Sequence, residues 1–357
     1  MDYLESVINP PKYDEDESPT RGRLRELKTY ILESNEGFPS QVITDELVCD
    51  VINTGLDKMK ILRTTAKNNG TLSEFYLDTS DPRFYVLHTN ERSEDSNRII
   101  ETLTKDMNHT FDHTWFYSDM LKRLSHKQGN VFKGFGVNYS DKFLRSGEDE
   151  DTEIEDLTLS ISGSLAEEMQ HLVESKPDIE RTIAYNKVRV LRGSRNSVLD
   201  SVQDDVHNIG YFAVKRGKSV QDHLQLVDIA QNEYEETITH VEDQRIGFKT
   251  IGDRTLVEGK SFDFEFPNRI ENLTLFIERM FNSAMPFKLW GIKSKIYDDY
   301  FKIMAVDLHT GSPMDFEISA DMMRVYLFKG NCGNTILRLF TNLQLYYDSN
   351  TTCKQLS

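Results

Sequence analysis

Four apolar runs near the C-terminal end of the chain decide the fold: FKLWGIKSKI (287–296), YFKIMAVDL (300–308), MDFEI (314–318) and MRVYLF (323–328). Short runs rich in aromatic and β-branched residues, separated by turn residues, are typical of β-strands. Strands joined by short turns pair antiparallel. The stretch that follows, TILRLFTNLQLYY (335–347), repeats apolar residues at helical spacing and predicts a helix.

The same mixture of strands and helices extends through the rest of the chain. Strands are expected at 59–65, 74–77, 83–88, 130–138, 157–162, 185–191 and 211–214, and a strand pair at 246–250 and 255–266 around Gly252-Asp253. Helical spacing predicts helices from Arg21, over 41–53, from Ser93 to about Met107, over 164–174 and over 269–283. Antiparallel pairings with interspersed helices indicate an α+β protein with largely antiparallel sheets, not a doubly wound parallel sheet.

Charge and proline divide the chain into a tail and two domains. Residues 1–20 carry three prolines and an acidic run, and predict a disordered acidic tail. Residues 148–156 hold seven acids in nine positions, which is typical of a linker. We therefore predict an N-terminal α+β domain over 21–147 and a C-terminal α+β domain over 157–357.

Composition excludes several classes of protein. The 357 residues include 59 acids and 42 bases, a formal charge of −17, which opposes broad nucleic-acid binding. Two basic turns, Arg189-Arg192-Arg195 and Lys215-Arg216-Lys218, lack interleaved aromatics and are predicted to be solvated loops, with a local nucleic-acid patch as the alternative. No apolar run is long enough to span a membrane, and the N-terminus lacks the features of a signal peptide. With only three scattered cysteines, a soluble cytoplasmic protein is expected.

The longest predicted helix runs from Ser219 to about Gln244. Its apolar stripe has alternating spacings of four and three, with one polar member: Val220, Leu224, Val227, Gln231, Tyr234, Ile238 and Val241. Such a stripe must be covered. It lies either on the domain's own sheet or against a second copy or another protein. In the second case Leu224, Val227, Gln231, Tyr234 and Ile238 form a partner-binding surface.

Asp307 and His309 are the first candidates for catalysis. Residues of equal parity share one face of a strand, and the face formed by Phe301, Ile303 and Ala305 turns polar at these two positions. A carboxylate beside an imidazole can raise its basicity for general-base chemistry. The alternative is a strand end that meets solvent.

The segment Lys329–Thr335 is the candidate anion site. Gly330 and Gly333 permit a tight turn before the last helix, whose free N-terminal amides, at Thr335 and beyond, attract anions. Lys329 and Arg324 would add positive charge. The segment is not a Walker A motif, and an ordinary glycine turn with a helix cap is the alternative.

The other histidine-containing segments, 109–113, 204–207 and 233–243, do not have the spacing of a metal site, and none is predicted. Without a catalytic motif, the first hypothesis is a non-enzymatic interaction protein that docks to itself or to a protein partner through helical and sheet surfaces. The alternative is a phosphate- or nucleotide-directed, nuclease-like hydrolase that uses Asp307 and His309 near the 330–335 turn. A nucleic-acid adaptor that uses the basic turns is a third interpretation.

Overall fold

The structure is a computed structural model that describes residues 26–107, 109–140, 156–176, 183–194, 197 and 200–356. The chain divides into two compact units. Unit 1 consists of Met1–Thr114, Lys122–Lys133 and Val188–Gln231, and unit 2 of Trp115–Leu121, Gly134–Lys187 and Asn232–Ser357. The predicted acidic tail lies outside the described residues, as does the predicted linker except for Asp156, so the boundary at 148–156 stays a prediction.

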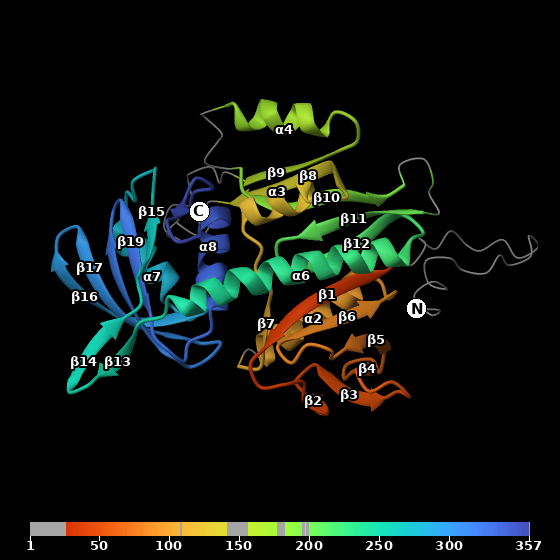
Figure 1. Ribbon diagram of the computed structural model, residues 1–357, viewed down its shortest axis with the longest axis horizontal. Coiled ribbons are helices and arrows are strands. Elements are labelled where there is room, and N and C mark those ends of the chain that lie inside the picture. Colours follow the sequence, from red (N-terminus) through yellow and green to blue (C-terminus); the bar gives the residue numbers. More distant parts are fainter. Residues whose placement is uncertain are drawn as a thin grey trace, which may run out of the picture. The chain divides into compact units, whose positions relative to one another are not determined.

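Unit 1 is built around an antiparallel sheet (Figure 1). Its strands follow the order β2-β3-β4-β5-β6-β1-β12-β11, and β7 also pairs with β1. Their bounds are β1 (Lys28–Ser34), β2 (Gln41–Ile43), β3 (Leu47–Asn53), β4 (Met59–Ala66), β5 (Leu72–Asp78), β6 (Phe84–Thr89), β7 (Phe111–His113), β11 (Ser201–His207) and β12 (Tyr211–Gly217). Strands β8 (Asn130–Ser140) and β10 (Tyr185–Gly193) contribute residues to both units.

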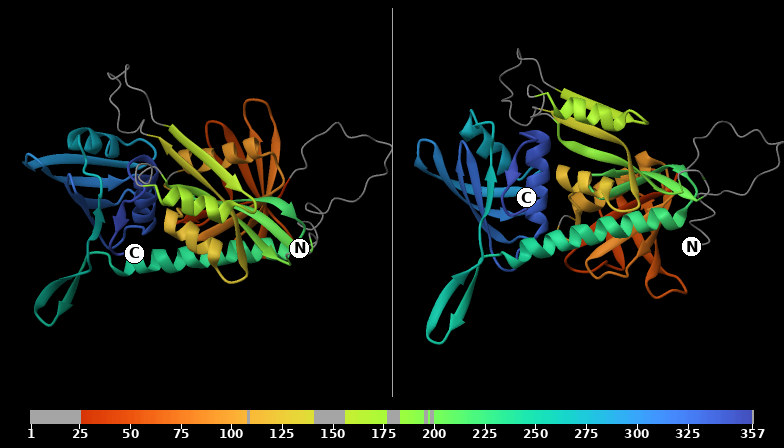
Figure 2. Two further views of the ribbon diagram at one scale, coloured as in Figure 1. Left: turned by 90° about the horizontal axis from the view of Figure 1, so that it is seen from above. Right: turned by 45° about the horizontal axis from the view of Figure 1, so that its top comes forward.

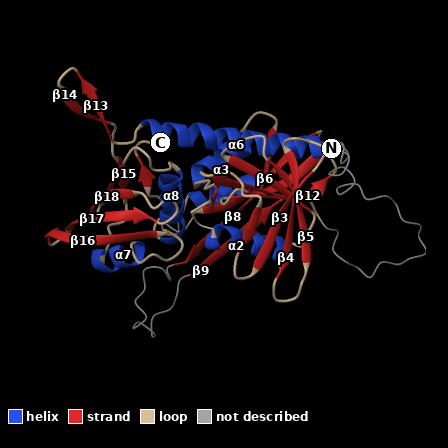
Figure 3. Cartoon of the chain, turned by 90° about the horizontal axis from the view of Figure 1, so that it is seen from below, coloured by secondary structure: helices blue, strands red, loops and turns tan. Residues whose placement is uncertain are grey.

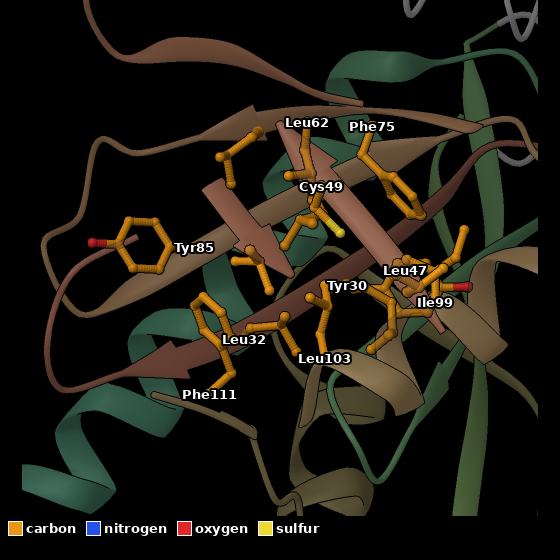
Figure 4. Close-up of a cluster of buried hydrophobic side chains, with 14 of the residues drawn as sticks. Tyr30, Leu32, Leu47, Cys49, Leu62, Phe75, Tyr85, Ile99, Leu103 and Phe111 are labelled. Atoms are coloured by element: carbon orange, nitrogen blue, oxygen red, sulfur yellow. The ribbon is translucent and has the colours of Figure 1, made fainter. Parts of the chain in front are cut away.

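The main core of unit 1 lies between one face of this sheet and helix α2 (Ser93–Asp106). Tyr30 and Leu32 of β1 pack there with Ile99 and Leu103 of the helix, and Figure 4 shows the cluster around Phe75. Tyr30 stacks on Tyr211 with ring centroids 4.8 Å apart and donates a hydrogen bond to Ser96. The helix predicted from Ser93 to about Met107 is therefore confirmed.

Two helices predicted in the first half are wrong. The segment from Arg21, which was expected to be helical, contains β1, and the predicted helix 41–53 is the β2–β3 hairpin. Every side chain of β1 is buried, the polar ones included, so the strand lacks the two-residue alternation of apolar and polar residues that marks a half-exposed strand. In the hairpin, Thr44 supplies the turn by accepting the Leu47 amide, at 3.0 Å, which ends β2 where a helix would continue.

Unit 2 contains a second antiparallel sheet with the strand order β16-β17-β18-β19-β15-β20 (Figure 3). The four apolar runs quoted first form β16 to β19 of this sheet, as predicted, and buried side chains alternate with exposed or half-buried ones along β17 and β19. The strand bounds in unit 2 are β9 (Asp156–Ser162), β13 (Gly247–Ile251), β14 (Arg254–Glu258), β15 (Phe262–Glu265), β16 (Leu289–Tyr297), β17 (Tyr300–Asp307), β18 (Pro313–Ser319), β19 (Met322–Leu327) and β20 (Thr352–Cys353).

Helix α8 (Asn334–Tyr346) carries much of the core of unit 2, because twelve of its residues are buried. The other helices among the described residues are α3 (Ser118–His126), α4 (Ala166–Glu174), α6 (Val220–Asp243) and α7 (Leu273–Met280). Residues 220–231 of α6 belong to unit 1 and residues 232–243 to unit 2. The α+β class with antiparallel sheets is thus confirmed.

Strands β13 and β14 form a separate two-stranded sheet (Figures 1 and 2). Gly252 and Asp253 join them, and Gly252 has a φ of +60°, which suits a two-residue hairpin turn. The hairpin extends away from the six-stranded sheet of the same unit.

No helix among the described residues combines the length and the apolar character needed to cross a lipid bilayer.

Candidate functional site

The predicted catalytic pair lies in the interior of unit 2. Asp307 ends β17, and both Asp307 and His309 are 0% exposed. The Asp307 carboxyl group accepts hydrogen bonds from the Thr335 hydroxyl and from the Arg338 guanidinium, and also from the His309 amide at 3.1 Å. The structure therefore brings Asp307 together with Thr335 and with a buried arginine.

Arg338 gives Asp307 a structural explanation. The guanidinium is 1% exposed, pairs with Asp307 and donates a second hydrogen bond to the Phe287 carbonyl at 3.1 Å. A buried charge is tolerated when it is paired and hydrogen-bonded, and this pair meets both conditions. Asp307 thus joins β17 to α8 inside the fold, and the catalytic role predicted for Asp307 and His309 gains no support from this geometry.

The turn before α8 does receive an anionic group, which comes from the chain itself. The Gly333 amide donates to the Glu242 carboxylate of α6 at 3.0 Å, and the Arg245 guanidinium donates to the Asn331 carbonyl at 2.6 Å. A helix N-terminus carries a partial positive charge that a carboxylate stabilises. Glu242 therefore occupies the position at which an external anion was predicted.

The remaining predicted anion ligands hold other carboxylates. Arg324 donates two hydrogen bonds to Asp263, at 2.8 and 3.3 Å, and Lys329 pairs with Glu258. Gly330 has a φ of +98°, a conformation that glycine adopts without strain, so it serves the turn. These contacts favour the structural alternative for the segment, an ordinary glycine turn before a helix.

The apolar stripe of α6 is largely covered by the protein itself. Val227, Tyr234 and Ile238 are buried, whereas Leu224 and Gln231 are half-buried. In unit 1, Leu224 packs on a cluster that includes Val202 and Val214. In unit 2, Tyr234 contacts Phe116 edge-on and accepts a hydrogen bond from Asn334 at 3.1 Å. The sequence allows the stripe to be covered either by the chain itself or by a partner, and these contacts correspond to the first alternative.

The basic turns are engaged in unit 1. Arg189 forms a bidentate pair with the Asp205 carboxylate, with hydrogen bonds of 2.5 and 2.8 Å. Arg192 donates a hydrogen bond to the Asn130 side chain at 2.8 Å. Lys215 lies 3.8 Å from a carboxylate oxygen of Glu26. Arg195 lies outside the described residues. Arg189 and Arg192 lie in β10, and Lys215 and Arg216 lie in β12, so the prediction of loops is wrong at these positions. The described contacts pair these side chains within the chain and do not favour a continuous phosphate-binding patch.

Sequence reasoning missed a buried chain of polar side chains in unit 1. His223 Nδ1 lies 3.0 Å from Asp204 Oδ1, and its Nε2 lies 2.7 Å from Thr29 Oγ1. The same hydroxyl lies 2.8 Å from His88 Nδ1. The order hydroxyl, imidazole, carboxyl is that of a nucleophile, its base and the group that orients the base.

Burial decides what this polar chain does. Thr29, Asp204 and His223 are 0% exposed and His88 is 3% exposed, so no reacting group meets solvent. The four side chains come from β1, β6, β11 and α6, and they fix the helix on the sheet through directional hydrogen bonds. The sequence analysis names Asp204 within the segment 204–207, but no spacing links it to His223, 19 positions away, or to Thr29. Only the fold reveals that these polar side chains are hydrogen-bonded to one another.

The buried histidine makes the stability of unit 1 depend on pH. Burial, with a smaller contribution from the charge of His223, lowers the pKa of His88 to about 3. The folded protein keeps His88 neutral, whereas the unfolded chain takes up a proton below a pH of about 6.5. The stabilisation is therefore complete above that pH and is lost as the pH falls towards 3.

We expect the free energy of unfolding to fall between pH 6 and pH 4 about 1.4 kcal/mol per pH unit more steeply in the wild type than in His88→Gln. Urea unfolding of both proteins across this range measures the difference, and the variant cancels the contribution of the other titrating groups. Parallel curves for the two proteins would show that His88 does not bind an extra proton on unfolding.

Unit 2 exposes large apolar side chains in two places. On the β13–β14 hairpin, Phe248 is 73%, Ile251 59%, Leu256 50% and Val257 67% exposed. On the outer face of β16 and β17, Trp290, Ile292 and Met304 are about half exposed or more, and Ile292 lies directly opposite Met304. Clustered exposed apolar side chains mark interaction sites on monomeric proteins. The sequence places both segments in strands but does not reveal that nothing among the described residues covers them.

Comparison with known proteins places the chain in a family. A family model described as MJECL33-like protein matches residues 5–356. The chain belongs to the MJECL33-like protein family. It is also similar to the protein MJECL33 of Methanocaldococcus jannaschii, with 28% identity over 364 residues that cover 91% of this chain and 85% of that protein. Both matches extend over nearly the whole length of this member of the MJECL33-like family. The proposal for its function rests on the geometry.

Proposed function

We propose that the chain is a non-enzymatic cytoplasmic interaction protein that docks to a protein through exposed β-sheet surfaces of unit 2. The observation that carries this proposal is the β13–β14 hairpin, which exposes four large apolar side chains at half or more of their area. A two-stranded hairpin is marginally stable by itself in water. Binding would bury these side chains and supply the missing contacts.

The cysteines are consistent with a reducing compartment. Cys49, Cys332 and Cys353 are free and buried. Burial raises the pKa of the Cys49 and Cys353 thiols to about 12, because a buried thiolate is poorly solvated. Thiols with such pKa values are poor nucleophiles, so these two serve the core.

The hydrolase alternative has less support. Asp307 is held by Arg338 and Thr335 in the interior, and Arg324 and Lys329 are bound to carboxylates of the same chain. A hydrolytic site needs groups that reach a substrate, and each of these groups already has a partner. Docking therefore remains the better-supported proposal.

Site-specific photo-crosslinking tests the docking proposal. A photoreactive phenylalanine analogue at Phe248, in the full chain expressed in cells, is expected to form covalent adducts with protein several-fold more efficiently than the same analogue at Leu172. Leu172 of α4 is the matched control, because it is 50% exposed and lies outside both clusters of exposed apolar side chains. Equal adduct yields at the two positions would contradict docking through the hairpin.

A further inference from the structure

The outer edge of β14 has a charge pattern that complements itself. The strand reads Arg254-Thr255-Leu256-Val257-Glu258 and pairs only with β13 in the described structure. In an antiparallel pair of two copies centred on Leu256, Arg254 of each copy lies opposite Glu258 of the other. Opposite charges facing each other across strands stabilise the pair, and like charges destabilise it. The register that uses the whole strand thus produces two ion pairs.

The charge of Glu258 is available for this contact. A hydrogen bond and the positive charge of Lys329 lower the pKa of Glu258, so the side chain is a carboxylate at neutral pH. Lys329 and Glu258 are both partly solvent-accessible, so a second cation can approach the carboxylate. Arg254 is exposed.

The other edge of the hairpin does not share this property. Strand β13 reads Gly247-Phe248-Lys249-Thr250-Ile251, and the register that uses all of it places Lys249 opposite Lys249 of the second copy. This like-charge contact disfavours pairing through β13. Strand β16, one edge of the six-stranded sheet, carries Lys293 and Lys295, and charged residues of this kind protect edges from pairing.

Pairing through β14 would also create a continuous uncharged face. In the hairpin, Phe248 lies opposite Val257 and Thr250 opposite Thr255, so these four side chains share one face. Two hairpins joined edge to edge form a four-stranded sheet in which this face is doubled. Three or more strands with an apolar face reach the stability that one hairpin lacks. We propose that two copies of the chain associate through antiparallel pairing of β14 with β14, centred on Leu256, about a two-fold axis. This inference rests on the proposed docking function and names its partner.

A charge-swap experiment tests the pairing. Arg254→Glu places two glutamates opposite each other twice per dimer, and Glu258→Arg does the same with arginines. Each variant alone is expected to dimerise about tenfold more weakly than the wild type in sedimentation equilibrium. Because all contacts between the two different variants are of opposite charge, an equimolar mixture of them is expected to recover dimers, each holding one copy of either variant. A tag on one variant identifies these mixed dimers.

Two controls separate other effects. Lys249→Glu changes the charge of the hairpin on the strand that should not pair, and we expect it to leave dimerisation unchanged. Lys329→Ala removes the partner of Glu258 within the chain, and therefore reports what part of the Glu258→Arg effect comes from that loss.

Failure of this inference can be told apart from failure of the docking proposal. A wild type that stays monomeric at high concentration, or a mixture that forms no mixed dimers, overturns β14 pairing. If the analogue at Phe248 then still forms adducts with a different protein, docking stands with another partner. If it forms none, both proposals fall.

Discussion

Arg338→Met is expected to lower the free energy of unfolding by about 3–5 kcal/mol, because it leaves the Asp307 carboxyl group buried without its cation. Asp307 would keep the Thr335 hydroxyl and the His309 amide as hydrogen-bond donors. These neutral donors do not replace a positive charge in an interior where Asp307 is fully buried. A loss of this size is a large part of the stability of a typical domain. Urea unfolding followed by circular dichroism measures it.

Two further variants show whether the loss comes from the unpaired charge. The double variant Asp307→Leu with Arg338→Met removes both charges. We expect its loss in free energy of unfolding to be clearly smaller than the sum of the losses in the two single variants. Arg63→Met is the matched control, because Arg63 pairs with Glu74 while both side chains are about half exposed. Its cost should stay within about 1 kcal/mol. A loss in Arg338→Met as small as that of the control would contradict a buried ion pair.

The sequence predicted those elements in which local pattern and tertiary position agree. Strands β17, β18 and β19 are half-exposed, so apolar and polar residues alternate and their turns are short. Strand β1 fails this test because it is covered on both faces, and only its neighbours β6 and β12 identify it as a central strand. The spacing of residues within a strand does not show whether segments distant in sequence bury one of its faces or both.

The same reason limits prediction of the candidate site. The sequence indicates Asp307 because a strand face turns polar there, and in the structure this carboxyl group pairs with Arg338, 31 positions further along. Glu242 lies 91 positions before Gly333, to which it is hydrogen-bonded, and His223 lies 194 positions after Thr29. Groups so far apart in sequence meet only through the fold, so their chemistry cannot be assigned from spacing.

The exposed apolar surfaces show the converse. The regular stripe of α6 lies on the longest helix predicted from the sequence, but most of it packs within the chain. The hairpin has weaker patterning, and its apolar residues remain exposed. A strong helical stripe shows that a surface must be covered, whereas only coordinates show which surface is left uncovered.

His223→Leu is expected to destabilise the fold by roughly 3–5 kcal/mol, since it removes the partner of the buried Asp204 carboxyl group. Asp204 Oδ2 has no hydrogen-bond partner even in the wild type, so the variant leaves the whole carboxyl group unsatisfied. Thr29 would lose one of its two imidazole contacts as well. Because these bonds attach the first half of α6 to the sheet, hydrogen exchange should accelerate most at residues 220–231.

A control on the same helix separates loss of the polar chain from the loss of any histidine. His240 is exposed, and we expect His240→Leu to change the free energy of unfolding by no more than about 0.5 kcal/mol. Thr29→Val keeps the shape of the side chain but removes the hydroxyl between the two imidazoles, so it should cost about 1–3 kcal/mol. If His223→Leu were as stable as His240→Leu, the hydrogen bonds of these four side chains would not hold α6 on the sheet.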